Sequence, residues 1–200
     1  MESLRLILIR HGETVENASH IVQGHLPGHL SDRGKEQALR ITKRLKDEKF
    51  DSVYSSDLER AFQTAEILMK DREGLPIITD PRLREQSFGI YEGKPVMAVL
   101  RQMKRKKADF TTFKPEGGEC FEDFRKRVKQ FLEKIKAKHS DHTVGLVTHF
   151  GVINILLGIF LNQNTGKISE SHIMNDTISI VNIETLGNVG VETITCKENL

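Results

Sequence analysis

Strand-length apolar runs alternate along this chain with longer stretches in which apolar residues recur every three or four positions. The clearest apolar run covers residues 4–9 and is broken only by Arg5, and further short strands are expected at residues 52–56, 75–79 and 143–148. The helical stretches cover residues 31–49, 58–70, 95–107, 121–139 and 152–160. A helix that connects two parallel strands crosses one face of their sheet. This alternation therefore predicts a mostly parallel sheet that is covered on both faces.

The alternation ends near the C-terminus, where two β-rich runs follow one another without a helix between them. Residues 177–183 and 189–195 flank the segment 186–188 (Leu-Gly-Asn), which is a hairpin signal. The expected fold is therefore α/β, a three-layer α/β/α sandwich with a mostly parallel central sheet and an antiparallel C-terminal strand. Because 200 residues without a linker or repeat suit one core, we expect a single domain over residues 1–200.

Charge balance and cysteine count exclude several classes of protein. Lys and Arg number 30 against 28 Asp and Glu, so we expect no nucleic-acid partner bound through a general positive field. Two cysteines are too few for a disulfide framework or a four-ligand zinc site. Residues 142–166 lack Asp, Glu, Lys and Arg, but Thr148, His149 and Asn154 interrupt them. We interpret them as a buried strand and helix, and expect a soluble cytoplasmic protein without a membrane partner.

Polar side chains follow the predicted strands at the sheet edge where ligands bind in folds of this kind. Arg10 and His11 follow the first strand, and Arg60 lies in the first turn of the helix after the second strand. Glu85 lies in the irregular segment after the third strand, and His149 follows the fourth. We therefore expect these five side chains to converge on one rim of the sheet.

These residue types suit phosphoryl transfer. Guanidinium groups bind phosphoryl oxygens bidentately, and they favour the neutral imidazole that can attack phosphorus. A carboxylic acid can protonate the departing alkoxide and then activate water; Glu85, Glu13 and Glu92 are the candidates. The helix N-terminus behind Phe150 offers a backbone N–H to an anion. Because these cations supply the electrostatic stabilisation that Mg²⁺ often supplies, neither a metal nor another cofactor is expected.

Short motifs follow one another in order over nearly the whole chain. They are Arg10-His11-Gly12-Glu13-Thr14, Asn17, Gln23-Gly24, Leu30-Ser31, Tyr54-Ser55-Ser56-Asp57-Leu58, Arg60, Leu83-Arg84-Glu85, Phe88-Gly89, Glu92-Gly93, Gly117-Gly118-Glu119 and Val147-Thr148-His149. This ordered set resembles the signature of the histidine phosphatase superfamily, in its phosphoglycerate-mutase-like branch and of the broad-specificity phosphatase type. The first pentapeptide alone is a weak signal, whereas the ordered set is a strong one.

The resemblance implies roles for individual residues. It implies that His11 is the nucleophile that becomes phosphorylated and that Glu85 is the general acid and base. The implied phosphate pocket consists of Arg10, Arg60 and His149, with help from Asn17. The expected substrate-binding residues are Asn17, Gln23, Gly24, Glu119 and Phe150. The chain departs from the family pattern at Phe150, where a glycine is common, and we expect such departures to affect pocket shape and substrate choice.

The function implied is that of a metal-independent phosphomonoester hydrolase, a histidine acid-type phosphatase that acts on a small phosphorylated metabolite. The alternative is a 2,3-bisphosphoglycerate-dependent phosphoglycerate mutase, which returns the phosphoryl group to product instead of water. A third hypothesis is a catalytically silent phosphate-binding module. The basic run 101–107 is interpreted either as a solvated helix face or as a positive wall over the pocket mouth. The sequence does not determine the oligomeric state.

Overall fold

The computed structural model describes residues 3–162, 175, 177–184 and 189–195. At its centre lies a six-stranded sheet with the strand order β3-β2-β4-β1-β5-β6. The strands are β1 (Ser3–Arg10), β2 (Ser52–Ser55), β3 (Ile77–Thr79), β4 (His142–Thr148), β5 (Thr177–Glu184) and β6 (Val189–Thr195). Strands β1 to β4 are parallel, β5 is antiparallel to β1, and β6 is antiparallel to β5. The mostly parallel sheet with its antiparallel C-terminal part is confirmed, and the predicted turn at 186–188 lies outside the described residues.

The helices largely follow the predicted stretches. They are α1 (Val15–Ala18), α2 (Asp32–Arg44), α3 (Glu59–Met69), α4 (Val96–Lys106), α5 (Phe121–Lys138) and α6 (Phe150–Phe160). The prediction that α2 extends to residue 49 is wrong. Its buried face ends at Leu45, and the carbonyls of Leu45 and Glu48 accept hydrogen bonds from Arg72 instead of continuing the helix. The short α1 was not predicted, because four residues held by a capping box between Thr14 and Asn17 show no apolar period.

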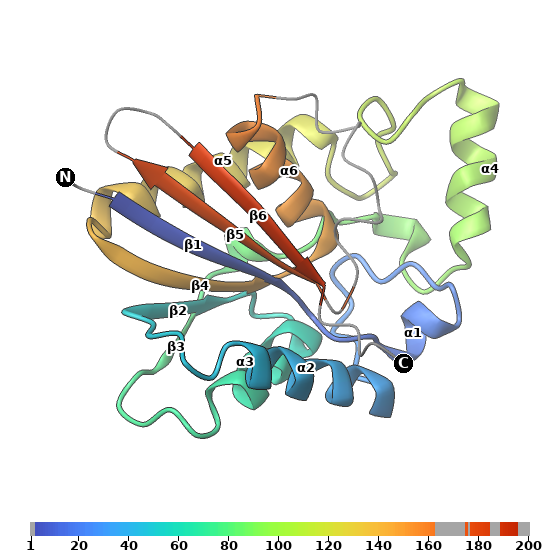
Figure 1. The fold of residues 1–200 in the computed structure, drawn as a ribbon. Helices are drawn as coiled ribbons and strands as arrows, with labels where there is room; N and C mark the ends of the chain where they lie inside the picture. The colour runs from blue at the N-terminus through green and yellow to red at the C-terminus, as the bar shows by residue number, and fades with distance from the viewer. Residues whose placement is uncertain (1–2, 163–174, 176, 185–188, 196–200) are drawn as a thin grey trace.

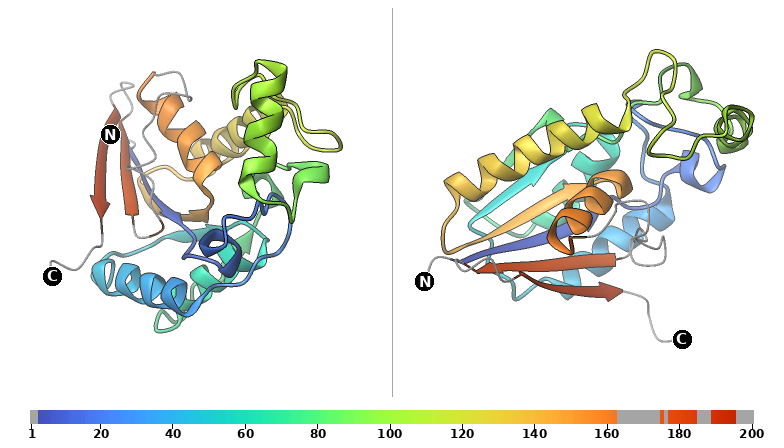
Figure 2. Two further views of the ribbon diagram at one scale, coloured as in Figure 1. Left: turned by 90° about the vertical axis from the view of Figure 1, so that its right-hand side faces the viewer. Right: turned by 90° about the horizontal axis from the view of Figure 1, so that it is seen from above.

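Alternate side chains of the central strands point to opposite faces of the sheet and bury two separate cores. Leu4, Leu6 and Leu8 of β1 belong to the core under α5 and α6. Ile7 and Ile9 of the same strand belong to the core under α2 and α3. Figures 1 and 2 show these two helix layers on either side of the sheet, which confirms the three-layer sandwich.

Helices α1 and α4 lie beyond the carboxyl end of β1, apart from the two main helix layers (Figures 1 and 2). A small core of its own anchors α4, in which Val99 and Met103 pack with Val22 and Phe113. Helix α4 and this small core therefore lie at the sheet edge where the sequence predicts a site. Within the described part of the chain, no helix combines the length and apolar character that a membrane crossing requires. The cytoplasmic location stays a prediction.

Candidate active site

His11 lies directly after β1, and the register of the sheet holds its backbone in place. Its N–H donates to the carbonyl of Thr148 at 2.9 Å, and its side chain is 3% exposed. Nδ1 lies 2.8 Å from the carbonyl oxygen of Gly12. Because a carbonyl oxygen only accepts hydrogen bonds, Nδ1 carries the proton, and Nε2 of the neutral ring keeps its lone pair. The local backbone therefore selects the tautomer in which Nε2 is the nucleophilic nitrogen.

Cationic groups surround this imidazole. Burial, followed by the charges of Arg60 and Arg10, holds the pKa of His11 well below its ordinary value of 6.5. Arg60 is 1% exposed, and three backbone carbonyls, those of Gly24, Leu26 and Pro27, accept hydrogen bonds from its guanidinium group. Burial lowers the pKa of Arg60 to about 10, so the group is still charged at neutral pH. Two fixed positive charges thus accompany a neutral imidazole.

His149 follows β4 and lies beside His11, with 5.1 Å between the ring centroids. Its Nε2 lies 2.8 Å from the hydroxyl oxygen of Ser56, which also accepts the N–H of Leu58. Among the described residues, Nε2 of His149 is the one acceptor to which this buried hydroxyl can donate its proton. The proton of the neutral ring is therefore on Nδ1, which is buried without a partner in the described structure. Burial, with Arg60, holds the pKa of His149 well below its ordinary value of 6.5.

Glu85 bridges its own loop and the start of α6. One carboxylate oxygen accepts the N–H of Gln86 at 2.9 Å, and the other accepts the N–H of Gly151 at 3.1 Å. A Cβ atom at position 151 would lie 2.3 Å from Oε1 of Glu85, so only glycine allows this close approach. The carboxyl group is consequently anchored at the edge of the cavity that His11 also lines.

Arg127 of α5 holds the loop that carries Glu85. It donates to the backbone carbonyls of Arg82, Arg84 and Glu85 at 2.7 to 2.8 Å. It also forms a bidentate ion pair with the Glu119 carboxylate, at 2.7 and 2.8 Å. All five N–H groups of its guanidinium are therefore used. No local sequence motif marks Arg127, so its role was not predicted.

The expectation that Glu119 binds the substrate is corrected by this arrangement. Both of its carboxylate oxygens face Arg127, and one also accepts the N–H of Ser87. Burial alone would raise the pKa of Glu119, but the hydrogen bonds from Arg127 and Ser87 hold it below the ordinary value. Glu119 is thus occupied in positioning the loop and does not line the cavity.

The remaining candidates come from α1 and the segment that follows it. The Oδ1 atom of Asn17 accepts two hydrogen bonds from Thr14, which leaves the amide nitrogen as its donor toward a ligand. Gly24 adopts a positive φ of 51°, and its carbonyl accepts a hydrogen bond from Arg60. Gln23 is 7% exposed and its Oε1 has no partner among the described residues. All three line the cavity beside His11.

A cavity of about 910 Å³ joins these groups. The predicted residues in its wall are Arg10, His11, Asn17, Gln23, Gly24, Arg60, Glu85 and Phe150. Asn175 also lines it and donates to the carbonyl of His11 at 2.7 Å, a contact that the sequence analysis missed. His149 is fully buried beside His11 and does not form part of the wall.

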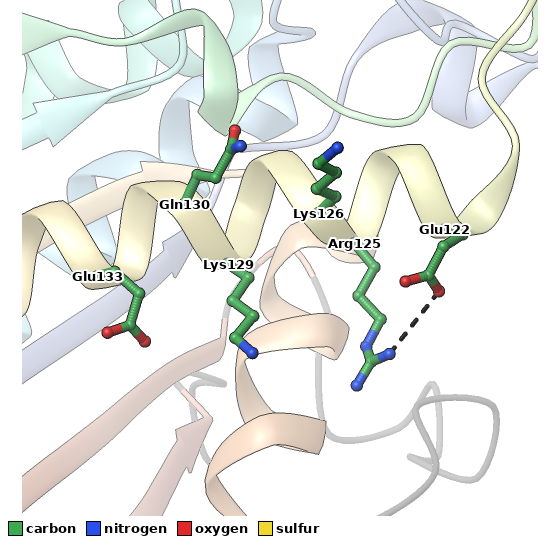
Figure 3. A pocket seen from close by; sticks show the side chains of 6 residues that line it. All are labelled: Glu122, Arg125, Lys126, Lys129, Gln130 and Glu133. Atoms are coloured by element: carbon green, nitrogen blue, oxygen red, sulfur yellow. Dashed lines mark ion pairs between the residues drawn. The ribbon is translucent and has the colours of Figure 1, made fainter.

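The basic run 101–107 does not contribute to this cavity. Helix α4 lines the cavity with Val96, Val99 and Leu100, while Arg101 and the four basic residues 104–107 are exposed. The structure therefore favours the solvated-face interpretation over a positive wall. A second hollow, of about 500 Å³, lies on the surface of α5 and contains none of the candidate residues (Figure 3). It is lined by Glu122, Arg125, Lys126, Lys129, Gln130 and Glu133.

Comparison with known proteins gives consistent matches. Residues 6–193 match the model of the histidine phosphatase superfamily (branch 1). Phosphoglycerate mutase-like protein 4 of Arabidopsis thaliana is 37% identical over 157 residues, 76% of this chain and 68% of that protein. The metal-independent phosphoserine phosphatase of the same plant is 33% identical over 91% of this chain and 77% of its own length. The crystal structure of the alpha-ribazole phosphatase from Shigella flexneri superposes with a TM-score of 0.84 at 30% identity, covering 96% of each chain.

Proposed function

The chain belongs to the histidine phosphatase superfamily (branch 1), and from this membership we propose that it hydrolyses a small phosphomonoester through a covalent phosphohistidine at His11. The observation that carries the proposal is the convergence of His11, His149, Arg60 and Glu85 from four separate segments on one buried corner. Phosphatases among the relatives, one of them described as metal-independent, support the same reaction class.

In the first step, the lone pair on Nε2 of His11 attacks the phosphorus atom. The bond from phosphorus to the ester oxygen breaks, and Glu85, in its carboxylic acid form, donates a proton to the departing alcohol. The hydrogen bond from Nδ1 to the Gly12 carbonyl orients the ring and stabilises the positive charge that develops on it. Arg10 and Arg60 neutralise the charge on the three transferred oxygens, which is the main requirement of phosphoryl transfer. The Nδ1–H of the neutral His149, beside His11 and without a partner among the described residues, is the further hydrogen-bond donor that we assign to these oxygens.

In the second step, water attacks the phosphorylated imidazole. Glu85, which gave its proton to the departing alcohol in the first step, now accepts a proton from that water. The bond from Nε2 to phosphorus breaks, and inorganic phosphate leaves. Because positive charge is supplied by side chains that are already in place, this mechanism needs no metal ion at any step.

The mutase alternative differs only in the acceptor of the phosphoryl group. A mutase must hold a second anionic group of its substrate close to the phosphohistidine. Among the described residues that line the cavity, the Lys and Arg side chains are Arg10 and Arg60, both assigned to the transferred phosphoryl group. The silent-module hypothesis requires a missing catalytic group, and each of the groups used above is present. Both considerations support hydrolysis.

A trapping experiment tests the proposal. We expect a ³²P-labelled phosphomonoester to label His11, with phosphate release unaffected by EDTA. His11→Ala should abolish both labelling and turnover, whereas the same substitution at the exposed His29 should change neither. Labelling of another residue, or normal turnover in His11→Ala, would refute the mechanism. Formation of 2-phosphoglycerate from 3-phosphoglycerate faster than phosphate release would favour the mutase.

A further inference from the structure

The part of the cavity that does not serve the phosphoryl group is strongly apolar. Its wall is built from helix α4, helix α6, the start of α5 and three loops. The apolar side chains in it are Ile21, Val22, Phe88, Val96, Val99, Leu100, Phe110, Phe121, Phe124, Phe150 and Ile155. We call this surface the apolar wall. A compact polar metabolite has no complementary chemistry for a surface of this kind.

Three members of the apolar wall are unusually exposed to solvent. Phe110 is 53% exposed, Leu100 is 37% exposed and Val96 is 36% exposed. Helix α4 nevertheless has a buried face of its own, because Val99 and Met103 anchor it in a separate small core. Its anchoring therefore does not require Leu100 and Val96 to face the cavity. Exposed apolar side chains gathered around one cavity mark a ligand or partner surface.

Charge is confined to the phosphoryl end of the cavity. Arg10 and Arg60 lie there, and the carboxylate of Glu13, also in the wall, is engaged with Ser31 and Arg33. Within the described part of the wall, no Lys or further Arg is available to a second anionic group. The other polar groups of the wall are the imidazole of His20, the hydroxyl of Thr111 and uncharged amides, including Asn154, whose Oδ1 is buried without a partner among the described residues.

Phe150 joins the two ends of the cavity. Its ring lies 5.5 Å from the guanidinium carbon of Arg10, and its neighbours Gly151, Asn154 and Ile155 line the same side of α6. A ligand whose phosphoryl group contacts Arg10 therefore lies close to an aromatic surface. This is the position at which the sequence departs from the family pattern by placing an aromatic residue where a glycine is common.

We infer that the substrate is a phosphate monoester of an alcohol with an extended, uncharged and largely apolar body, and that the apolar wall binds this body. The inference rests on the proposed function, because it takes the phosphoryl end to be the reacting end. The volume of about 910 Å³ supports it, because cavities of roughly 300–1,000 Å³ hold ligands far larger than a three-carbon phosphoacid. Phosphoglycerates and bisphosphates would leave the apolar wall in contact with water.

A series of alkyl phosphates tests the inference, because methyl, butyl and hexyl phosphate differ in apolar body but carry the same reacting group. We expect kcat/KM to rise about threefold per added methylene, and so about 10²-fold from methyl to hexyl phosphate. The kcat/KM for hexyl phosphate should also exceed that for 3-phosphoglycerate. Rates independent of chain length, or a preference for 3-phosphoglycerate, would overturn the inference while leaving the proposed function intact.

Two substitutions on α4 provide the matched comparison. Leu100→Asn should lower kcat/KM for hexyl phosphate about fivefold and leave methyl phosphate unchanged. Met97→Asn, on the same helix and 55% exposed outside the cavity, should change neither value. Equal effects of the two substitutions on hexyl phosphate would contradict a role for the apolar wall.

Binding of alkylphosphonates separates the inference from the proposed function, because these analogues cannot be hydrolysed. Affinity measured by calorimetry should rise with chain length in the intact protein and less steeply in Leu100→Asn. If no ester released phosphate but phosphonate affinity rose in this way, the proposed function would fail, and with it the assignment of a substrate, while binding of an apolar body by the apolar wall would stand. Affinity without chain-length dependence would refute the inference whatever the turnover.

Discussion

Arg127→Lys is the substitution that most sharply tests how the site is assembled. Arg127 does not line the cavity, yet its five hydrogen bonds join the carboxylate of Glu119 to the backbone carbonyls of Arg82, Arg84 and Glu85. Lysine keeps the charge but offers at most three donors from a single nitrogen and cannot reproduce the planar fork. The loop should consequently lose its fixed position without losing its neighbouring charge.

The magnitude follows from the lost contacts. Two or more hydrogen bonds at a net value of about 1 kcal/mol each predict a loss of about 2 kcal/mol in the free energy of unfolding. That loss is small enough for the protein to stay folded, since domains are typically stable by about 5–15 kcal/mol. If Glu85 moves by about 1 Å, catalysis should fall by up to about 10²-fold.

The leaving-group dependence of the rate is the readout that distinguishes positioning from general destabilisation. Protonation by Glu85 matters for an alkyl phosphate, whose alkoxide leaves poorly, and matters little for 4-nitrophenyl phosphate. Arg127→Lys should therefore lower kcat/KM, which reports formation of the phosphohistidine, about 10- to 100-fold for hexyl phosphate and less than threefold for 4-nitrophenyl phosphate. Glu85→Gln should show the same pattern, more strongly. Urea denaturation gives the accompanying stability change.

Arg125→Lys is the matched control, because Arg125 lies on the same helix and forms only a surface ion pair with Glu122 at 3.7 Å. It should leave both rates and the stability unchanged. Equal slowing of both substrates by Arg127→Lys, in a protein that denatures at its usual urea concentration, would refute the positioning argument.

Three further predictions follow from the same geometry. Because the unfolded chain protonates His11 and His149 at pH values where the folded chain does not, the free energy of unfolding should fall as pH drops below 6.5, by up to about 1.4 kcal/mol per pH unit for each group. Urea denaturation at several pH values should show that the free energy of unfolding depends less steeply on pH in His149→Asn than in the unsubstituted protein. Gly151→Ala should lower kcat at least tenfold, because the added Cβ displaces the Glu85 carboxylate. Steady-state kinetics measures this effect, and an unchanged kcat would show that the Glu85 loop adapts freely. Ser56→Ala should lower kcat about tenfold, because the loss of the Ser56 hydroxyl removes the hydrogen bond that keeps the His149 proton on Nδ1. ¹⁵N NMR spectra that show an unchanged His149 tautomer would contradict that assignment.

The sheet and most of the helices were predictable because their signals are local. Buried strands such as β1 and β4 are continuous apolar runs, and a helix such as α5 repeats its apolar residues at helical spacing. The end of α2 and the presence of α1 were not predictable in this way. Both depend on single contacts, the hydrogen bonds of Arg72 to two carbonyls and the capping box of Thr14.

In the candidate site, too, some residues were predictable from local signals and others were not. By itself, the sequence determined which groups lie at the carboxyl ends of the strands, because a residue that follows a parallel strand is carried to that edge wherever the strand sits in the sheet. His11, Arg60 and His149 were predicted in this way. Side chains that act through contacts with distant segments were decided only by the tertiary structure. Glu119 pairs with Arg127 instead of facing a ligand, and α4 turns Leu100 rather than its basic residues toward the cavity. Packing between segments far apart in the chain sets those orientations, and no local pattern encodes them.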